Sequence, residues 1–341
     1  MSATKKPMEF TPFKLSPHGM WGGIENIARA TVAAEQMGFY SIDMPDHIIL
    51  PHKPTDPPMT DEVWYDNFVV ASHLATLTKK IRFMFFALIV PYRPAIQTAK
   101  LLATLDVVSK GRVTLGTGSG WMKGEFELLG VPFAERGRIT DETLRAFRAL
   151  WTEGHPEFHG KFVNFSNARF EPKPVQKPHI PLWIGGMGAA ARRRCVEMGD
   201  GWMPMGGGSA ESQQFKDAAS EVGVIKEMLQ KAGRNPDDFN FSFALAVGEQ
   251  RPYMPHPTAA TEDRMGRAAR PAAPVAAPAH GTAPLPFDQN LVIDQIGRMR
   301  EAGFNHIYVR LGFSSADEII KHMEWFSSKV MPAFQKTAVK R

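Results

Sequence analysis

Strand-like and helix-like segments alternate along the whole of this 341-residue chain. Parallel strands must be joined by crossover helices, and they are buried on both faces when helices cover the sheet. The run Ile81–Val90 is apolar almost throughout, which is typical of such a strand. The eight runs that predict strands are Met8–Phe13, Phe39–Met44, Ile81–Val90, Val113–Thr117, Leu182–Gly185, Gly201–Pro204, Phe241–Val247 and His306–Leu311.

Helical patterns lie between these runs. One extends from Gly23 to Met37, and another begins at Pro94 and stops at Gly111. Later ones cover residues 210–232, 289–302 and 315–334. Eight βα units predict an α/β fold, a (β/α)8 TIM barrel that forms a single domain over residues 1–341. A doubly wound open sheet is the alternative, and the absence of a second domain pattern favours the closed barrel.

Three long segments follow predicted strands, which would place them as insertions on the carboxyl-terminal face of the barrel, where barrel enzymes build their active sites. They are Pro45–Asp66, Gly118–Pro181 and Arg251–Phe287. The second carries a helical pattern at Asp141–Trp151. The third holds eight prolines and ten alanines in 37 residues, so we expect most of it to be disordered.

Composition excludes several classes of protein. No apolar run reaches 18 residues, and the amino-terminal residues lack a secretory pattern, so we expect a cytoplasmic protein without a membrane span. The net charge of +5 is spread along the chain, which disfavours nucleic-acid binding. The single cysteine, Cys195, excludes an intramolecular disulfide and a cysteine-based zinc site. The histidines show no metal-ligand spacing, so no metal is expected.

A short apolar run opens into glycines and then into a helical pattern over residues 181–192. The N–H groups at a helix start lack partners and carry partial positive charge, so they attract phosphate. Gly185, Gly186 and Gly188 have no Cβ and would let a phosphate approach the main chain closely. A tight turn without a ligand is the alternative interpretation.

Asp46 and His47 directly follow the second predicted strand. Histidine exchanges protons near neutral pH, and a nearby carboxylate can orient it or raise its pKa. A loop histidine beside a turn aspartate is the alternative. Their place at the carboxyl end of a barrel strand makes a functional pair an equally good interpretation.

A second glycine-rich segment, Gly116–Trp121, follows the fourth predicted strand. Its alternating glycines would admit a planar ligand, while the Thr117 and Ser119 hydroxyls and the tryptophan offer polar and aromatic contacts. The helix and acidic residue of a dinucleotide fingerprint are not in the required places, and a glycine-rich turn is the alternative. Glu125 and Glu127, just beyond, are expected to be solvated.

Together these residues resemble the bacterial luciferase-like family of flavin- or deazaflavin-dependent oxidoreductases, whose fold is the (β/α)8 barrel. The matching motifs keep the family's order over residues 39–204, and residues 288–335 fit the last βα units. The motifs are Ser41–His47, Leu102–Arg112, Leu115–Met122, Glu125–Phe126, Leu129–Gly130, Arg136–Gly137, Asp141–Glu142, Leu150–Trp151, Pro172–Gln176, Ile184–Gly186 and Gly199–Trp202.

The resemblance implies that a flavin-type coenzyme, F420 or FMN, binds non-covalently across the barrel mouth. It implies a bulge in the third strand behind the ring, with a non-proline cis peptide at Phe86–Ala87. It also matches His47 to the family's active-site histidine, with Asp46 beside it. The phosphate would lie at Gly185, Gly186, Met187 and Gly188. The other coenzyme-binding residues would be Phe86, Ala87, Gly116, Thr117 and Gly118.

Two departures from the family pattern bear on the substrate. Pro91–Pro94 is one residue shorter than the equivalent segment of many relatives. Trp121 stands where deazaflavin-dependent sugar-phosphate dehydrogenases have a glutamate, which disfavours a sugar-phosphate substrate.

The function that the resemblance implies is oxidation or reduction of a small organic substrate. Two reactions stay open: hydride transfer with F420, and monooxygenation with reduced FMN and O2. A separate flavin or F420 reductase could supply the reduced coenzyme. The resemblance also implies a homodimer. F420 is favoured, because the motif set resembles deazaflavin-dependent members more and because a mildly basic chain suits the acidic tail of this coenzyme. The alternative is a non-catalytic flavin-binding barrel or an inactive partner subunit, which the retained Asp46–His47 pair and glycine loop disfavour. A phosphosugar aldolase or isomerase would need a lysine or glutamate at an inner strand end, and no good candidate is found.

Overall fold

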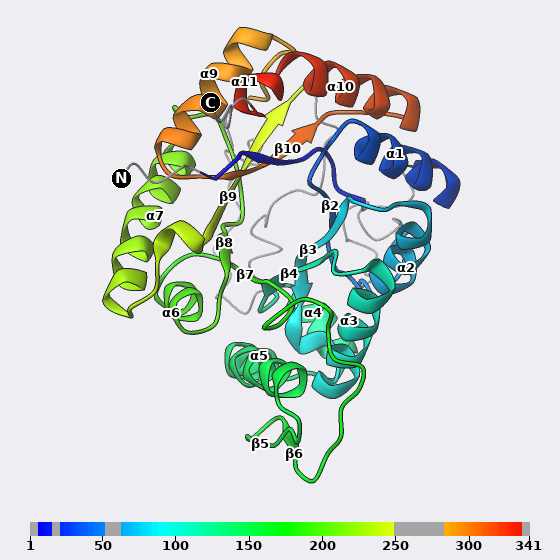
Figure 1. Cartoon of the computed structure of the whole chain (residues 1–341), viewed down its shortest axis with the longest axis vertical. Helices are drawn as coiled ribbons and strands as arrows, with labels where there is room; N and C mark the ends of the chain where they lie inside the picture. The colour runs from blue at the N-terminus through cyan, green and yellow to red at the C-terminus, as the bar shows by residue number, and fades with distance from the viewer. Residues whose placement is uncertain (1–5, 16–20, 52–62, 249–282, 336–341) are drawn as a thin grey trace, which may run out of the picture.

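Eight parallel strands curl into a barrel with helices around the outside (Figure 1). This computed structural model describes residues 6–15, 21–51, 63–248 and 283–335. Around the barrel the strand order is β1-β10-β9-β8-β7-β4-β3-β2. The strands are β1 (Glu9–Thr11), β2 (Ser41–Met44), β3 (Arg82–Ile89), β4 (Val113–Gly118), β7 (Leu182–Gly185), β8 (Gly201–Met203), β9 (Asn240–Val247) and β10 (His306–Leu311).

Backbone hydrogen bonds join the first and last strands of this order. The Tyr40 N–H donates to the Phe10 carbonyl at 2.9 Å, and the Leu15 N–H donates to the Asp43 carbonyl at 2.8 Å. The sheet is therefore a closed barrel and not a doubly wound open sheet. Each of the eight predicted strands is present, and the first is shorter than its apolar run because only its central residues pair with β10.

The helices that follow the strands cover the outside of the barrel (Figure 1). They are α1 (Ile24–Gln36), α2 (Asn67–Leu77), α3 (Ala95–Ser109), α5 (Arg136–Thr152), α6 (Ala189–Glu197), α7 (Gln213–Lys231), α9 (Gln289–Glu301) and α10 (Ala316–Lys329). Capping side chains accept hydrogen bonds from first-turn N–H groups at the starts of α2, α7, α9 and α10. The capping residues are Asp66, Ser212, Asp288 and Ser315.

Two helix predictions need correction. The pattern at 315–334 is not one helix, because α10 ends at Lys329 and a short α11 (Pro332–Gln335) follows. Proline cannot continue the hydrogen-bond ladder of a preceding helix, so Pro332 starts a new one. The helix predicted at Asp141–Trp151 begins earlier, at Arg136, and belongs to the outer helical layer, since the Trp151 indole N–H donates to the Ala99 carbonyl of α3.

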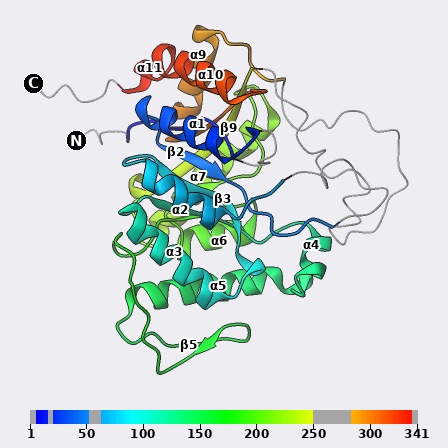
Figure 2. The same ribbon diagram turned by 90° about the vertical axis from the view of Figure 1, so that its right-hand side faces the viewer.

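The segment between β4 and β7 also contains a short helix, α4 (Lys123–Leu128), and a hairpin of β5 (Phe158–His159) and β6 (Asn164–Phe165). Figure 2 places α4 at one end of the barrel and the hairpin at the outer edge, beyond α5. Because α4 follows β4 almost directly, it lies at the carboxyl-terminal face.

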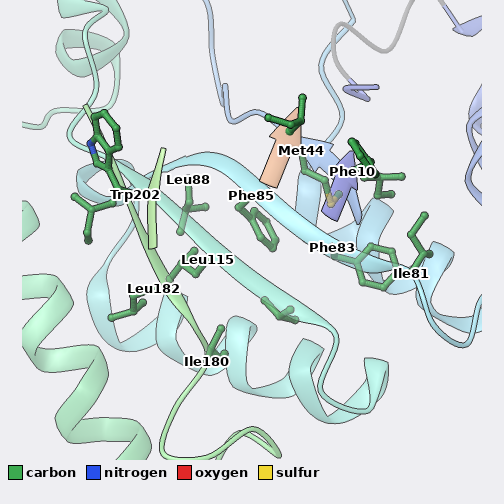
Figure 3. Close-up of a cluster of buried hydrophobic side chains, with 14 of the residues drawn as sticks. Phe10, Met44, Ile81, Phe83, Phe85, Leu88, Leu115, Ile180, Leu182 and Trp202 are labelled. Carbon is green, nitrogen blue, oxygen red and sulfur yellow. The ribbon is translucent and has the colours of Figure 1, made fainter. Parts of the chain in front are cut away.

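The main hydrophobic core fills the space between the strands and the outer helices. Phe83, Phe85 and Leu88 of β3 and Leu115 of β4 contribute to this layer (Figure 3). Met84 belongs instead to a smaller cluster inside the barrel, with Trp183, Met203, Tyr40 and Phe86. Phe83 and Phe85 are two residues apart but Leu88 follows after three, so the alternation of a regular strand is broken between Phe85 and Leu88.

The predicted disorder of 251–287 falls mostly outside the described residues. Its last residues are ordered, however: the Leu285 N–H donates to the Ala246 carbonyl of β9 at 3.0 Å, and the Phe287 ring packs against His322 and Trp325. Packed structure therefore resumes before the predicted boundary. Within the described ranges no helix has the length and apolar character needed to cross a membrane.

Candidate active site

The third strand carries the expected bulge. The register between β3 and β4 shifts between Phe85 and Leu88, and the Phe86–Ala87 peptide is cis, as the resemblance implies. On the neighbouring strand Gly118 faces this bulge, because a Cβ at that position would lie 3.2 Å from the Ala87 Cβ. The bulge thus sits at the carboxyl ends of β3 and β4.

His47 lies just past β2 and contacts a carboxylate far along the chain. Its Nδ1 is 2.8 Å from Oε2 of Glu125, which belongs to α4. The His47 side chain is 9% exposed and that of Glu125 is fully buried. An imidazole nitrogen that faces a carboxylate oxygen carries a proton, so Nε2 is left to exchange protons with a ligand.

Glu125 also accepts three further hydrogen bonds. Its Oε1 accepts from the N–H groups of Ile48 and Ile49 at 2.7 and 3.3 Å, and its Oε2 accepts from the Tyr92 hydroxyl at 2.8 Å. Burial, together with the neighbouring Glu125 charge, raises the pKa of Tyr92, so this hydroxyl stays a donor. The expectation that Glu125 is solvated is therefore wrong, whereas Glu127 is exposed as expected.

The sequence did contain a signal for the burial of Glu125. Met122, Phe126 and Leu129 are apolar at helical spacing, and Glu125 lies on the same face of that turn. In the structure Gly124 packs so closely on the chain after His47 that a Cβ there would lie 2.9 Å from the Pro51 Cγ. This contact brings α4 onto the His47 segment.

Asp46 does not orient His47, which corrects the sequence interpretation of the pair. Both oxygens of Asp46 bind the Arg93 guanidinium, at 2.7 and 2.9 Å, and Oδ2 also accepts from the Ile89 N–H at 3.0 Å. Burial disfavours the charged guanidinium, but the ion pairs with Asp46 and Asp66 outweigh it and raise the pKa of Arg93. Asp46 therefore links the ends of β2 and β3 and has a structural role next to the site.

Two tryptophans flank the imidazole. The Trp64 ring centroid lies 4.5 Å from that of His47 and the Trp121 centroid lies 6.4 Å away, both in edge-to-face arrangements. The surroundings of His47 are therefore mainly aromatic. The expectation that the Gly116–Trp121 segment supplies an aromatic wall agrees with this position of Trp121.

The glycine loop lies at the carboxyl end of β7. Gly186 and Gly188 have φ angles of +99° and +89°, which other residues adopt only with strain. A Cβ at Gly185 would lie 2.5 Å from the Thr117 carbonyl oxygen, so this position also requires glycine. The Trp202 indole donates to the Gly186 carbonyl at 2.8 Å, which holds that carbonyl on the barrel side of the loop.

The residues of this loop fit a phosphate. Gly188 is the N-cap of α6, the first turn of α6 contains no acidic residue, and a Cβ on Gly188 would meet nothing within 4 Å. The space beside the helix start is thus open, and no carboxylate of that turn would repel an anion. Met187 is exposed on the same loop. The α6 arginines face elsewhere: Arg192 binds Glu221, and Arg193 and Arg194 bind Asp141.

Gly116 and Thr117 serve the barrel interior instead. A Cβ at Gly116 would lie 2.2 Å from the Phe85 carbonyl oxygen, so glycine is needed for strand packing. The buried Thr117 hydroxyl donates to the Trp183 carbonyl, so it is not available to a ligand at the barrel mouth, contrary to expectation. Within the described part of the chain, no three His, Cys, Asp or Glu side chains gather closely enough to hold a metal ion.

The tertiary structure brings the predicted site elements to one side of the barrel mouth. Strands β2, β3, β4 and β7 are consecutive neighbours in the barrel. The His47–Glu125 pair, the β3 bulge and the glycine loop therefore lie along adjacent carboxyl ends. This arrangement offers a proton-exchanging imidazole, a backbone surface at the bulge and a candidate anion site within one region.

Comparison with known proteins identifies the family. The luciferase-like monooxygenase profile matches residues 8–252. An uncharacterised protein of Mycobacterium tuberculosis is 34% identical over 212 residues, which cover 59% of this chain and 70% of that protein. An FMNH2-dependent dimethylsulfone monooxygenase of Pseudomonas putida is 35% identical over 150 residues, which cover 43% of this chain and 41% of the relative.

The F420-dependent tetrahydromethanopterin reductase of Methanopyrus kandleri shares the fold. It is 19% identical and superposes with a TM-score of 0.70, covering 96% of this chain and 99% of the reductase chain. The profile covers more than half of the chain, and its match extends over the bulge, the His47 segment and the glycine loop. This chain belongs to the luciferase-like monooxygenase family.

Proposed function

We propose that this protein is an oxidoreductase that binds a flavin-type coenzyme, FMN or F420, non-covalently at the carboxyl-terminal mouth of the barrel and acts on a small organic substrate. The observation that carries the proposal is the His47–Glu125 pair beside the β3 bulge and the glycine loop. The names of the two relatives described above, one dependent on FMNH2 and one on F420, support both coenzymes.

When bound, the coenzyme would supply the redox chemistry, either as hydride transfer or, for reduced FMN, as reaction with O2. The residues that would hold it are Gly186, Met187 and Gly188 for the phosphate and Phe86, Ala87 and Gly118 for the ring. The open helix start and the close-packed backbone of the bulge both fit these roles.

His47 would handle the proton of the reaction. Its Nδ1 is held by Glu125, so the same imidazole can accept a proton at Nε2 and give it back. Glu125 would fix the orientation of the ring, because its carboxylate accepts the hydrogen bond from Nδ1. The flanking Trp64 and Trp121 would limit access of water to Nε2 and favour substrates with an apolar part.

The proposal is tested by titrating the purified full-length protein with FMN, anaerobically reduced FMN and F420, and following absorption and fluorescence. We expect saturable binding of at least one of them. Reoxidation of the bound reduced coenzyme by a panel of small organic acceptors without O2 would indicate hydride transfer, and oxygen-dependent product formation would indicate oxygenation. The His47→Ala variant should retain coenzyme binding but lose most turnover.

The exposed His73 on α2 provides the matched control, and His73→Ala should behave as wild type. Absence of binding by all three coenzymes at millimolar concentration would overturn the proposal. Tight binding with no turnover on any acceptor would instead support the alternative of a non-catalytic flavin-binding barrel.

A further inference from the structure

Asp43 is a buried acid inside the barrel that none of the roles above uses. It lies on β2 two residues after Ser41, so both side chains point to the barrel interior. The Ser41 hydroxyl bonds that of Thr11, which also bonds His306. Asp43 and Tyr308 are each two residues further along their strands, so they form the next layer towards the mouth.

The layer below Asp43 is fully paired. His306 is completely buried, and its two ring nitrogens lie 2.9 Å from the Thr11 hydroxyl and 2.8 Å from the Ser242 hydroxyl. Its ring also packs edge-on against Trp183, with centroids 5.1 Å apart. Buried polar atoms in native proteins are normally satisfied in this way, and exceptions need an explanation.

Asp43 is such an exception. Its side chain is 1% exposed, and Oδ1 has no hydrogen-bond partner among the residues that the structure describes. The Tyr308 hydroxyl and the N–H groups of Met44 and Phe86 lie near the carboxyl and lower its pKa.

Burial raises the pKa of the Asp43 carboxyl well above its usual range, and the Lys14 charge and these donors do not offset it. A neutral carboxyl has one O–H donor and one carbonyl acceptor. With its proton on Oδ1, the neutral carboxyl would present a donor at the atom that has no partner among the described residues. Phe86, one of the residues that influence this carboxyl, is the first residue of the bulge.

We propose that Asp43 is a coenzyme-contacting residue whose Oδ1 donates a hydrogen bond to a carbonyl oxygen or ring nitrogen of the bound flavin-type coenzyme. This inference rests on the proposed function, which places the ring at the bulge that Asp43 adjoins. Electron density on such acceptor atoms rises when the ring is reduced. The contact therefore favours the reduced coenzyme over the oxidised one.

Two variants test this inference through coenzyme affinity. In Asp43→Asn the amide N–H replaces the Oδ1 donor, so affinity should stay within about threefold of wild type, which corresponds to about 0.65 kcal/mol. Asp43→Ala removes the donor and should weaken binding of the reduced coenzyme about tenfold, as loss of one hydrogen bond does. Binding of the oxidised form should weaken less. If Asp43→Ala weakens binding of both redox forms equally, and Asp43→Asn does not restore the affinity, Asp43 has only a structural role.

A measurement without coenzyme provides an independent check. Asp106 is equally buried, but its two oxygens accept hydrogen bonds from Gln176 at 2.7 and 3.1 Å. Asp106→Asn should therefore lower the melting temperature, whereas Asp43→Asn should not. An equal decrease in both variants would show that Oδ1 is paired in solution and would overturn the inference.

Infrared difference spectra complete the test. Wild type should show a protonated-carboxyl band that shifts when coenzyme binds and that is missing in Asp43→Asn. If wild type binds coenzyme and this band does not move, the Asp43 inference fails while the proposed function stands. If wild type binds no coenzyme at all, both fail.

Discussion

The substitution Glu125→Gln isolates what the buried carboxylate does for His47. The glutamine carbonyl oxygen can accept from the Ile48 and Ile49 N–H groups, as Oε1 does in the wild type. The amide nitrogen must then face His47 Nδ1 and the Tyr92 hydroxyl, where Oε2 now accepts. Because an amide nitrogen only donates, Nδ1 must lose its proton and Nε2 must gain one.

The cost follows from the hydrogen bonds that change. Two bonds to a charged oxygen, each worth about 1.5–3 kcal/mol, become two neutral bonds worth about 1 kcal/mol each. The free energy of unfolding should therefore fall by about 2 kcal/mol. For a chain of 341 residues that corresponds to a decrease in Tm of about 3 °C. Glu125→Ala would be more severe, because four donors would lose their acceptor in a buried place.

The assay combines calorimetry with nitrogen-15 NMR of the imidazole, in which the two-bond couplings report the tautomer. The His47 signal is assigned by its absence in His47→Gln. We expect the Nδ1–H form in the wild type and the Nε2–H form in Glu125→Gln. The matched control is Glu127→Gln on the same helix, where the side chain is 65% exposed and nothing should change. An unchanged tautomer together with an unchanged Tm in Glu125→Gln would refute this reasoning.

Three further predictions concern the glycine loop, the support of the site and the base of the barrel. Gly186→Asp puts a side chain and a negative charge at the helix start. It should weaken coenzyme binding about 30-fold, since a charge at a helix terminus is worth up to about 2 kcal/mol. Gly233→Asp, at a similarly positive φ, should strain the backbone but leave affinity unchanged. Equal affinities in the two variants would remove the phosphate assignment. Asp46→Asn should cost about 3 kcal/mol in unfolding experiments, the lower end for a broken buried ion pair. It removes the nearer of the two carboxylates that compensate Arg93, while Asp66 stays 3.5 Å away. A loss below about 0.5 kcal/mol, roughly the median for exposed pairs, would contradict the burial argument. Burial raises the pKa of Glu9 to about 7, so the folded state binds more protons than the unfolded state between pH 4.5 and 7. The free energy of unfolding should therefore fall as pH rises through that window, by about 3 kcal/mol at most. Glu9→Gln should abolish this slope, and the same slope in both proteins would contradict the role of Glu9.

The closed barrel could be predicted from the sequence because its signals are local. Each strand is a short apolar run, and Gly111, which ends the pattern that became α3, has a φ of +80° where glycine is favoured. The positive φ angles at Gly186 and Gly188 likewise depend on residues that are visible in the loop itself. The ordered family motifs add to these signals, and they predicted the bulge at Phe86.

The partners of the acidic side chains could not be read in the same way. Asp46 is adjacent to His47 in the sequence, yet it binds Arg93, while the carboxylate that contacts His47 comes from Glu125, 78 residues away. Successive residues of an extended chain point in opposite directions, so neighbours in sequence are poorly placed to pair with one another.

The chain alone therefore determined the architecture, the family and the glycines that the anion site requires. Only the tertiary structure decided which carboxylate holds the imidazole, and that Asp43 carries an unpaired oxygen beside the bulge. The physical reason is range: helix and strand periodicity acts over a few residues, whereas a hydrogen-bond partner is chosen by how β2, β4 and α4 pack at the carboxyl ends of the barrel.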